Sequence, residues 1–548
     1  MKNKHLDSLP VHGILEEQIA WYEASLSLHE RRGRGHFSTP PLLVEHILDA
    51  CGYTLDSDLH AIRVLDPACG SGNFLAAAAQ RLVSFAARTG LPQEERAALV
   101  QRNLWGFDPD PISCFLSEMQ LSAAVTPSPG SVDASTPMTA TRWHIHQADG
   151  LALPWPEPCV DLFLANPPYL AAKNTDLSAY RTAYRRGQAD SYLLFLNLGL
   201  HIVRPGGWLG LVLPDPLLAR TNAASERTRL LKEFTIHHLW HLSDVFTAQV
   251  GAVVIIAQKF PPTSQHQVAW KREKWHHSAA PTSNVRPMPL TSPAATIAQS
   301  LFLHQPCAEL RYLLSNEQGT TVERLQSYLA SIPASSSALT PLNKFVSISR
   351  GEELGRKSPY LIQQETAVDH EKYIYHPLLR GGKDIRPFQP PHSRWWIARE
   401  AVTKPLERYL SPKLLVVKST DRLQAALDLQ GHVALQTLYL LHLRKPDAPT
   451  DDLYFFLALL NSRLLQRYIY VLYTAYKWVQ PQIEQHVLAQ LPVPIVTARE
   501  KEAVIARSKL LVQACGPTGS VVEWKKDKQD IYEEQERALS TLYNTLIC

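Results

Sequence analysis

The sequence predicts an open, mainly parallel α/β sheet over its first half and a mixed α+β domain in its second half. Short apolar runs alternate with stretches of helical periodicity between residues 41 and 260. Each apolar run ends at Gly or polar residues, which is typical of parallel strands whose carboxyl ends bind ligands. The length of 548 residues exceeds one ordinary core, so we expect two or three domains.

The first half of the chain alternates helices and strands. Residues 12–33 have apolar side chains such as Ile14 and Ile19 at helical spacing, and the helix is expected to end near Gly33. A strand is expected over 61–65, because its apolar run leads through a Gly-rich turn into an alanine-rich helix. The remaining predicted elements are helices over 41–51, 74–87 and 193–203, and strands over 103–107, 143–147, 160–165, 208–213 and 253–258.

Stretches rich in Pro, Ser and Thr predict where the chain divides. Six prolines lie within residues 261–297, and residues 121–141 read as a loop inserted between two strands. The predicted organisation is a helical extension over 1–32, a first domain over 33–260, a linker over 261–300, a second domain over 301–500 and a helical tail over 501–548.

Composition excludes several classes of protein. No run approaches the roughly 18 apolar residues of a membrane-spanning helix, and the N-terminus lacks the apolar core of a signal peptide. The seven cysteines never form a CxxC pair, which disfavours a disulfide framework or a zinc site. We therefore expect a cytoplasmic protein with no metal and no membrane partner.

The second half of the chain carries excess positive charge. Residues 341–480 hold 20 Lys and Arg against 13 Asp and Glu, a net charge of +7, whereas the whole chain is +4. Aromatic and basic residues alternate at 394–396 and 468–478. This pattern suits contact with nucleic acid, because aromatic rings stack on bases and cations meet phosphates. The charge excess also suits a solvated face, and the alternation of aromatic and basic residues also suits a helix with half of its face buried.

A Gly-rich turn and three carboxylates predict a cofactor site. The segment 66–72, Asp-Pro-Ala-Cys-Gly-Ser-Gly, follows a strand and opens a helix but lacks the spacing of NAD-binding and ATP-binding loops. Asp66 suits a cationic amino or sulfonium group. Asp108 is placed to accept bonds from ribose hydroxyls, and Asp149 from an adenine amine. Each aspartate could instead cap the following helix.

The tetrapeptide Asn166-Pro167-Pro168-Tyr169 follows the apolar strand and predicts a site for an amine. The lone pair of an exocyclic amine is delocalised into its ring, so the amine is a poor nucleophile. The carbonyl oxygens of Asn166 and Pro167 could accept hydrogen bonds from the two N–H groups of the amine and direct its lone pair at a methyl donor. Tyr169 could stack on the base. The alternative is a simple Pro-Pro turn after a strand.

These motifs, in this order, resemble those of adenine-N6 DNA methyltransferases of restriction-modification systems, in the gamma class typified by TaqI. The catalytic-domain resemblance rests on residues 35–40, 65–74, 106–110, 148–150, 166–169, 190–195 and 245–246. A weaker resemblance to the TaqI-like C-terminal specificity domain rests on 350–351, 379–385, 413–418, 437–439, 459–462 and 491–494. Ser38 departs from the family, which usually has Tyr there.

The resemblance implies a Rossmann-like sheet that uses S-adenosylmethionine over 33–260 and a DNA target-recognition domain over 301–500. It assigns the catalytic role to Asn166, Pro167 and Tyr169, and contact with the target base to Tyr169 and Phe246. The implied cofactor-binding residues are Thr39, Pro40, Asp66, Ala68, Gly70, Gly72, Asp108, Asp149 and Asn166.

The function expected from the resemblance is transfer of a methyl group from S-adenosylmethionine to N6 of a flipped-out adenine in double-stranded DNA. The protein would be the modification component of a restriction-modification or phage-defence system, with a separate nuclease or other defence subunits as partners. The first 32 residues are too few for a fused nuclease. The alternatives are another amine substrate (cytosine N4, RNA adenine or protein glutamine) and a non-catalytic DNA-recognition subunit, whose motifs should be degraded.

Overall fold

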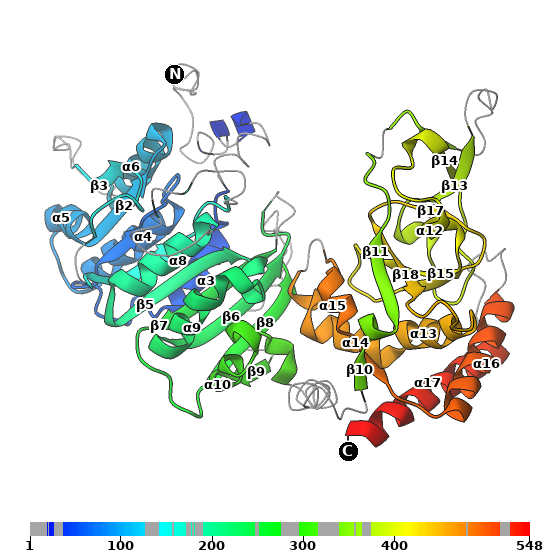
Figure 1. Ribbon diagram of the computed structural model, residues 1–548. Helices are drawn as coiled ribbons and strands as arrows, with labels where there is room; N and C mark the ends of the chain where they lie inside the picture. The colour runs from blue at the N-terminus through cyan, green and yellow to red at the C-terminus, as the bar shows by residue number, and fades with distance from the viewer. Residues whose placement is uncertain are drawn as a thin grey trace. The chain divides into compact units, whose positions relative to one another are not determined.

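The computed structural model describes residues 19, 21–22, 24–26, 37–126, 142–155, 158–170, 177, 180, 190–246, 251–275, 295–315, 339–355, 358–363, 374–477, 481–515 and 526–547 (Figure 1). The chain forms two compact units, residues 1–315 and residues 316–548. In the described part of the chain, every helix is too short or too polar to span a bilayer.

The first unit is built on one nine-stranded sheet with the strand order β3-β2-β1-β4-β5-β7-β6-β8-β9. Neighbouring strands from β3 to β5 are parallel, and β7 is antiparallel to both β5 and β6. The strands are β1 Val64–Asp66, β2 Leu104–Asp108, β3 His144–Gln147, β4 Val160–Ala165, β5 Val203–Pro214, β6 Thr235–Ser243, β7 Ala252–Gln258, β8 Gln267–Lys274 and β9 Ala295–Ala298. The predicted α/β class is confirmed.

Helices cover both faces of this sheet (Figure 1). They are α3 Pro41–Ala50, α4 Asn73–Arg88, α5 Gln93–Asn103, α6 Pro111–Val125, α8 Ser191–Ile202, α9 Ala224–Glu233 and α10 Gln299–Leu303. Two glycines identify the faces, because a Cβ on Gly199 of α8 would meet Leu209, whereas one on Gly210 would meet Ile47 of α3. Leu209 and Gly210 are successive residues of β5, so their side chains point to opposite faces. Helices α3 and α8 therefore sandwich the sheet.

The second unit has the expected mixed α+β composition. One four-stranded sheet has the order β11-β18-β15-β16, the other has the order β12-β14-β13-β17, and a small sheet pairs β10 with β19. The strands are β10 Leu339–Pro341, β11 Val346–Arg350, β12 Leu361–Gln363, β13 Tyr375–Leu379, β14 Trp395–Ala398, β15 Lys413–Val417, β16 Ala425–Asp428, β17 Val433–Ala434, β18 Leu438–Leu443 and β19 Pro492–Pro494. Side chains of both four-stranded sheets, such as Leu415 and Ile397, share one hydrophobic core.

Helices pack against several strands of the second unit. They are α12 Glu407–Leu410, α13 Asp452–Asn461, α14 Arg463–Leu472, α15 Gln485–Ala489, α16 Ala498–Cys515 and α17 Lys526–Ile547. Of these, α13 packs on β15 and β16, and α17 packs on β19. Ser462 separates α13 from α14, and its hydroxyl caps α14 by accepting a bond from the backbone N–H of Leu465 at 3.3 Å.

The linker predicted over 261–300 is wrong in part, because β8 and β9 within it are strands of the large sheet. Charged residues in β8 hide the strand pattern, although Val268 and Trp270 are buried. The first unit also extends to residue 315. Tyr312 explains the extension, since its hydroxyl lies 2.6 Å from Nδ1 of His241 on β6 and its ring lies 4.7 Å from that of Trp270.

Two other predicted segments lie largely outside the described residues. Of the helix expected over 12–33, Ile19 and Tyr22 are among the few described residues and both are helical. In the predicted 121–141 loop, only residues 121–126 are described, and residues 121–125 of these complete α6. Motif residues Gly35 and His36 are also outside the described part of the chain.

Candidate active site

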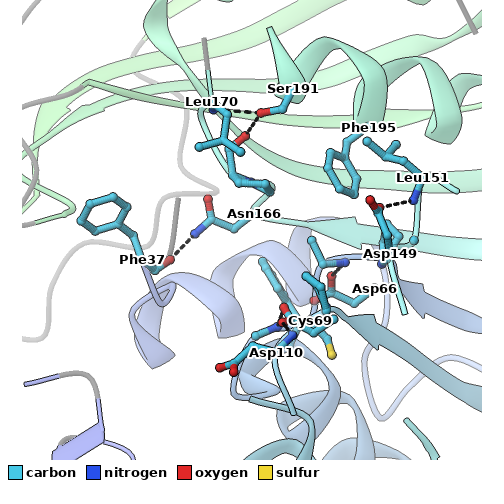
Figure 2. A pocket seen from close by; sticks show the side chains of 18 of the residues that line it. Phe37, Asp66, Cys69, Asp110, Asp149, Leu151, Asn166, Leu170, Ser191 and Phe195 are labelled. Atoms are coloured by element: carbon cyan, nitrogen blue, oxygen red, sulfur yellow. Dashed lines mark hydrogen bonds between the residues drawn. The ribbon is translucent and has the colours of Figure 1, made fainter. Parts of the chain in front are cut away.

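A pocket of about 320 Å³ opens at the carboxyl ends of β1, β2, β3 and β4 (Figure 2). Its volume is within the range of small-molecule sites. Among the described residues that line it, the charged side chains are all carboxylates, namely those of Asp66, Asp108, Asp110 and Asp149. Such a pocket favours a ligand with positive charge. Thr39, Ala68, Gly70 and Asn166, which are also predicted to bind the cofactor, line the same pocket.

Asp66 is the most deeply buried of these carboxylates. It ends β1, is 1% exposed, and accepts a bond from the backbone N–H of Ala68 at 3.1 Å. Burial raises the pKa of Asp66 to about 8, although the bond from Ala68 opposes that shift. The free protein therefore holds much of this carboxyl group protonated at neutral pH, and a cation bound beside it would favour ionisation.

Asp108 ends β2 and is held by two backbone donors. Its Oδ2 accepts from Gly70 N at 3.0 Å, and its Oδ1 accepts from Asp110 N at 2.9 Å. Burial raises the pKa of Asp108 to about 6. The carboxylate thus joins the Gly-rich turn to the start of α6.

Asp110, which the prediction did not include among the site residues, links the pocket to the N-terminal segment. Its Oδ2 accepts bonds from the Ser113 hydroxyl at 2.9 Å and from the hydroxyl of Tyr22. Tyr22 is fully buried against Ile112 and Leu116 of α6. No local pattern signals this contact, because the two residues are 88 positions apart.

Asp149 follows β3 and lies beside a tyrosine that the sequence did not indicate. Its Oδ1 accepts from Leu151 N at 2.9 Å, and its Oδ2 accepts from the hydroxyl of Tyr180. Burial and this bond raise the pKa of Tyr180 to about 12, so the phenol stays neutral. The neighbouring Gly150 is also required, because a Cβ there would lie 2.2 Å from the carbonyl oxygen of Pro67.

Two residues predicted to bind the cofactor are not among those lining the pocket. Gly72 adopts φ 95° at the start of α4, and a Cβ there would lie 2.4 Å from Ser117 Oγ on α6. This glycine permits close packing of two helices. Pro40 precedes α3, and its carbonyl oxygen accepts a hydrogen bond from the backbone N–H of Leu43 at 2.9 Å. Both residues shape the backbone around the site.

The tetrapeptide begins where β4 ends at Ala165, and Asn166 reaches the pocket edge (Figure 2). Asn166 Nδ2 donates to the carbonyl oxygen of Phe37 at 2.7 Å. This bond fixes which way the amide points, so Oδ1 is the atom available to accept. The hydroxyl of Tyr169 lies 3.2 Å from Asn166 Oδ1 and 3.2 Å from the carbonyl oxygen of Val212.

Three aromatic rings gather beside Asn166. The ring of Phe246 lies 6.4 Å from that of Tyr169, edge to face, and 6.1 Å from that of Phe37. Phe246 is 8% exposed. Burial raises the pKa of Tyr169, which keeps the phenol neutral. The structure thus brings Phe246, which is distant in the sequence, beside the tetrapeptide that holds Asn166 and Tyr169.

Comparison with known proteins identifies the family. Residues 20–274 match the N-6 DNA methylase model, and residues 376–493 match the TaqI-like C-terminal specificity domain. The type II methyltransferase M.PaeR7I of Pseudomonas aeruginosa is 31% identical over 234 residues, 41% of this chain and 39% of that protein. M.BstVI of Geobacillus stearothermophilus is 28% identical over 236 residues, 41% of each. The chain therefore spans about two fifths of the length of the curated relatives that it matches.

A solved structure resembles nearly the whole chain. The type IIL restriction-modification enzyme MmeI, in complex with DNA, superposes with a TM-score of 0.63, covering 96% of this chain and 78% of that one at 12% identity. At this identity the likeness concerns the fold. The family matches lead to one assignment: residues 20–274 belong to the N-6 DNA methylase family, and residues 376–493 form a TaqI-like C-terminal specificity domain.

Proposed function

We propose that the protein transfers a methyl group from S-adenosylmethionine to N6 of adenine at a specific site in double-stranded DNA. The observation that carries this proposal is the orientation of Asn166, whose amide is fixed by the Phe37 carbonyl so that Oδ1 is left as the acceptor. An acceptor at that point matches the need of a weakly nucleophilic amine. The family assignment supports adenine as the base.

The carboxylates of the pocket suit this cofactor. S-adenosylmethionine supplies a methyl group already activated on a positively charged sulfur. In the proposal Asp66 holds the cationic methionine end, Asp108 accepts from the ribose hydroxyls, and Asp149 accepts from the adenine amine. Thr39, Ala68 and Gly70 complete this site, and the backbone at Pro40 and Gly72 shapes it.

The target base would have to leave the duplex, which costs a few kcal/mol of unstacking. Asn166 Oδ1 and the carbonyl oxygen of Pro167 would then accept hydrogen bonds from the two N–H groups of the amine. These bonds would direct its lone pair at the methyl carbon. Tyr169 and Phe246 would contact the flipped base and offset part of the unstacking cost. As the bond between nitrogen and the methyl carbon forms, the bond between sulfur and that carbon would break, and the cofactor would leave as a neutral thioether. The nitrogen would then release its extra proton to water, and no nucleophilic side chain is needed.

The choice of DNA as the polymer draws on the second unit. Its TaqI-like domain and the DNA in the MmeI complex support a duplex partner. Within the unit, the guanidinium of Arg380 lies 3.9 Å above the ring of Trp395. This pair places a cation beside an aromatic ring, the combination that suits contact with nucleic acid. We further propose that the protein serves as the modification component of a restriction-modification or other defence system, beside a separate nuclease.

The substrate is tested by incubating the protein with tritiated S-adenosylmethionine and separate samples of unmethylated DNA, RNA and cell protein. Label is expected in DNA, and mass spectrometry of the digested nucleosides should identify N6-methyladenine. Label on cytosine N4, in RNA or in protein would contradict the adenine assignment. Tight cofactor binding without any transfer would point to a non-catalytic recognition subunit.

The high pKa of Asp66 predicts that cofactor affinity depends on pH. The bound cation favours the ionised carboxylate, but in the free protein burial raises the pKa of Asp66 to about 8. Affinity is therefore expected to increase with pH, by up to about tenfold between pH 6.5 and 7.5, where most of the carboxyl group is still protonated in the free protein. Isothermal titration calorimetry measures this, and Asp66→Asn should remove the dependence. An unchanged slope in that variant would contradict the role given to Asp66.

A further inference from the structure

Helix α8 holds the tetrapeptide through the side chain and backbone of Ser191, its first residue (Figure 2). Ser191 Oγ accepts from the backbone N–H of Leu170 at 2.9 Å and donates to the carbonyl oxygen of Pro168. The backbone N–H of Ser191 also donates to the carbonyl oxygen of Leu170 at 2.9 Å. Pro168 and Leu170 are the two neighbours of Tyr169, so one hydroxyl fixes the backbone on both sides of that tyrosine.

The tetrapeptide depends on such outside support because of its own composition. Pro167 and Pro168 have no backbone N–H, so neither can donate a bond that would anchor the turn. Ser191 is only 2% exposed, which keeps water from competing for its hydroxyl. The carboxylate of the preceding residue, Asp190, forms an ion pair with the guanidinium of Arg220, with 3.1 Å between Oδ2 and the nearest nitrogen. The start of α8 is therefore a firm support for the turn.

We propose that Ser191 is a positioning residue for methyl transfer, an inference that rests on the proposed function. Its hydroxyl bonds to the backbone of the residues on either side of Tyr169 and so fixes where the tyrosine ring lies. Ser191 also lines the pocket, but its hydroxyl is engaged by the backbone groups of Pro168 and Leu170. It therefore acts through the geometry of the turn, and displacements of about 1 Å in such groups can cost about 100-fold in rate.

The test compares Ser191→Ala with the wild type and with Ser462→Ala. Ser462 is a matched control in the second unit, because it too is buried, accepts from a helix N–H at 3.3 Å and donates to a backbone carbonyl at 2.7 Å. Ser191→Ala is expected to lower kcat by roughly 10- to 100-fold while the Kd for S-adenosylmethionine stays within about threefold. Ser191→Cys keeps the shape with a weak hydrogen-bonding group, and it should reproduce the loss if the alanine variant is poorly folded.

A double-mutant cycle separates positioning from general stability. In a Tyr169→Ala background the tyrosine is gone, so adding Ser191→Ala should cost less than about threefold further in kcat. Ser462→Ala should have the same small effect in both backgrounds. The positioning role is contradicted if Ser191→Ala and Ser191→Cys both keep wild-type kcat, or if the loss is equally large in both backgrounds. Absence of wild-type transfer to DNA would instead contradict the proposed function, and this inference with it.

Discussion

Asn166→Ala is expected to lower methyl transfer by roughly 100- to 1,000-fold, the scale observed when one preorganised polar group is removed from an active site. The variant removes the acceptor Oδ1 and the Nδ2 donor that binds the Phe37 carbonyl at 2.7 Å. Because the carboxylates of the cofactor pocket are untouched, the Kd for S-adenosylmethionine should stay within about tenfold. Single-turnover rates and calorimetry measure the two quantities separately.

A second variant at the same position tests orientation. Asn166→Asp keeps an acceptor but replaces the Nδ2 donor by an oxygen that would face the Phe37 carbonyl, so the side chain should turn away and activity should fall as well. Asn103→Ala is the control, since the Nδ2 of Asn103 likewise donates to a backbone carbonyl, that of His60 at 2.8 Å, and Asn103 is a buried residue outside the pocket lining. An Asn166→Ala protein with wild-type turnover would contradict the proposed mechanism.

The largest effect on stability is expected from Asp428→Asn in the second unit. Asp428 and Lys413 are both 0% exposed and their side chains lie 2.6 Å apart. The same carboxylate accepts backbone bonds from Gln430, Gly431 and His432 at 3.0 to 3.2 Å. Loss of the carboxylate leaves a buried lysine without its partner, which costs about 3–5 kcal/mol. Urea unfolding measures the loss, and hydrogen exchange at β15 and β16 locates it.

An exposed ion pair of equal length serves as the control for this effect. Lys509 and Asp451 also lie 2.6 Å apart, but their side chains are 39% and 54% exposed. Solvent screening limits such a pair to about 0–1 kcal/mol, so Asp451→Asn should change the free energy of unfolding little. Equal losses in the two aspartate variants would show that burial does not govern the contribution of Asp428.

The same carboxylate predicts a dependence of stability on acid. Burial alone would raise the pKa of Asp428, but the bond from His432 and the charge of Lys413 outweigh it and lower the pKa to about 2. A lowered pKa stabilises the fold fully above the unfolded value near 4, and the contribution is lost as the pH falls toward 2. The wild type should lose about 2 kcal/mol over that range, whereas Asp428→Asn should lack this part of the slope.

The parts of the site predicted from the sequence are those that follow directly from local pattern. Asp66 and Asp108 end apolar runs, and a parallel sheet brings strand ends together whatever the rest of the chain does. Asn166 belongs to a tetrapeptide that is informative by itself. The open sheet and the pocket at its carboxyl edge therefore follow from the order of a few short segments.

The contacts that were missed join residues distant in sequence. Tyr22 reaches Asp110, Tyr180 reaches Asp149, and Ser191 holds Pro168, and none of these pairs is marked by spacing. The Gly-rich motif predicts a cofactor role for Gly72, but it does not reveal that the lack of a Cβ there is needed for packing against α6. Such requirements depend on which helices meet, and that is decided by tertiary packing.

The central claim is methylation of adenine N6 in a specific DNA sequence. It is tested most directly by incubating the wild-type protein with S-adenosylmethionine and unmethylated genomic DNA, followed by sequencing that detects modified bases. N6-methyladenine at one recurring motif, absent when Asn166→Ala replaces the wild type, is the predicted result. DNA left without N6-methyladenine, while the protein binds S-adenosylmethionine, would contradict the claim.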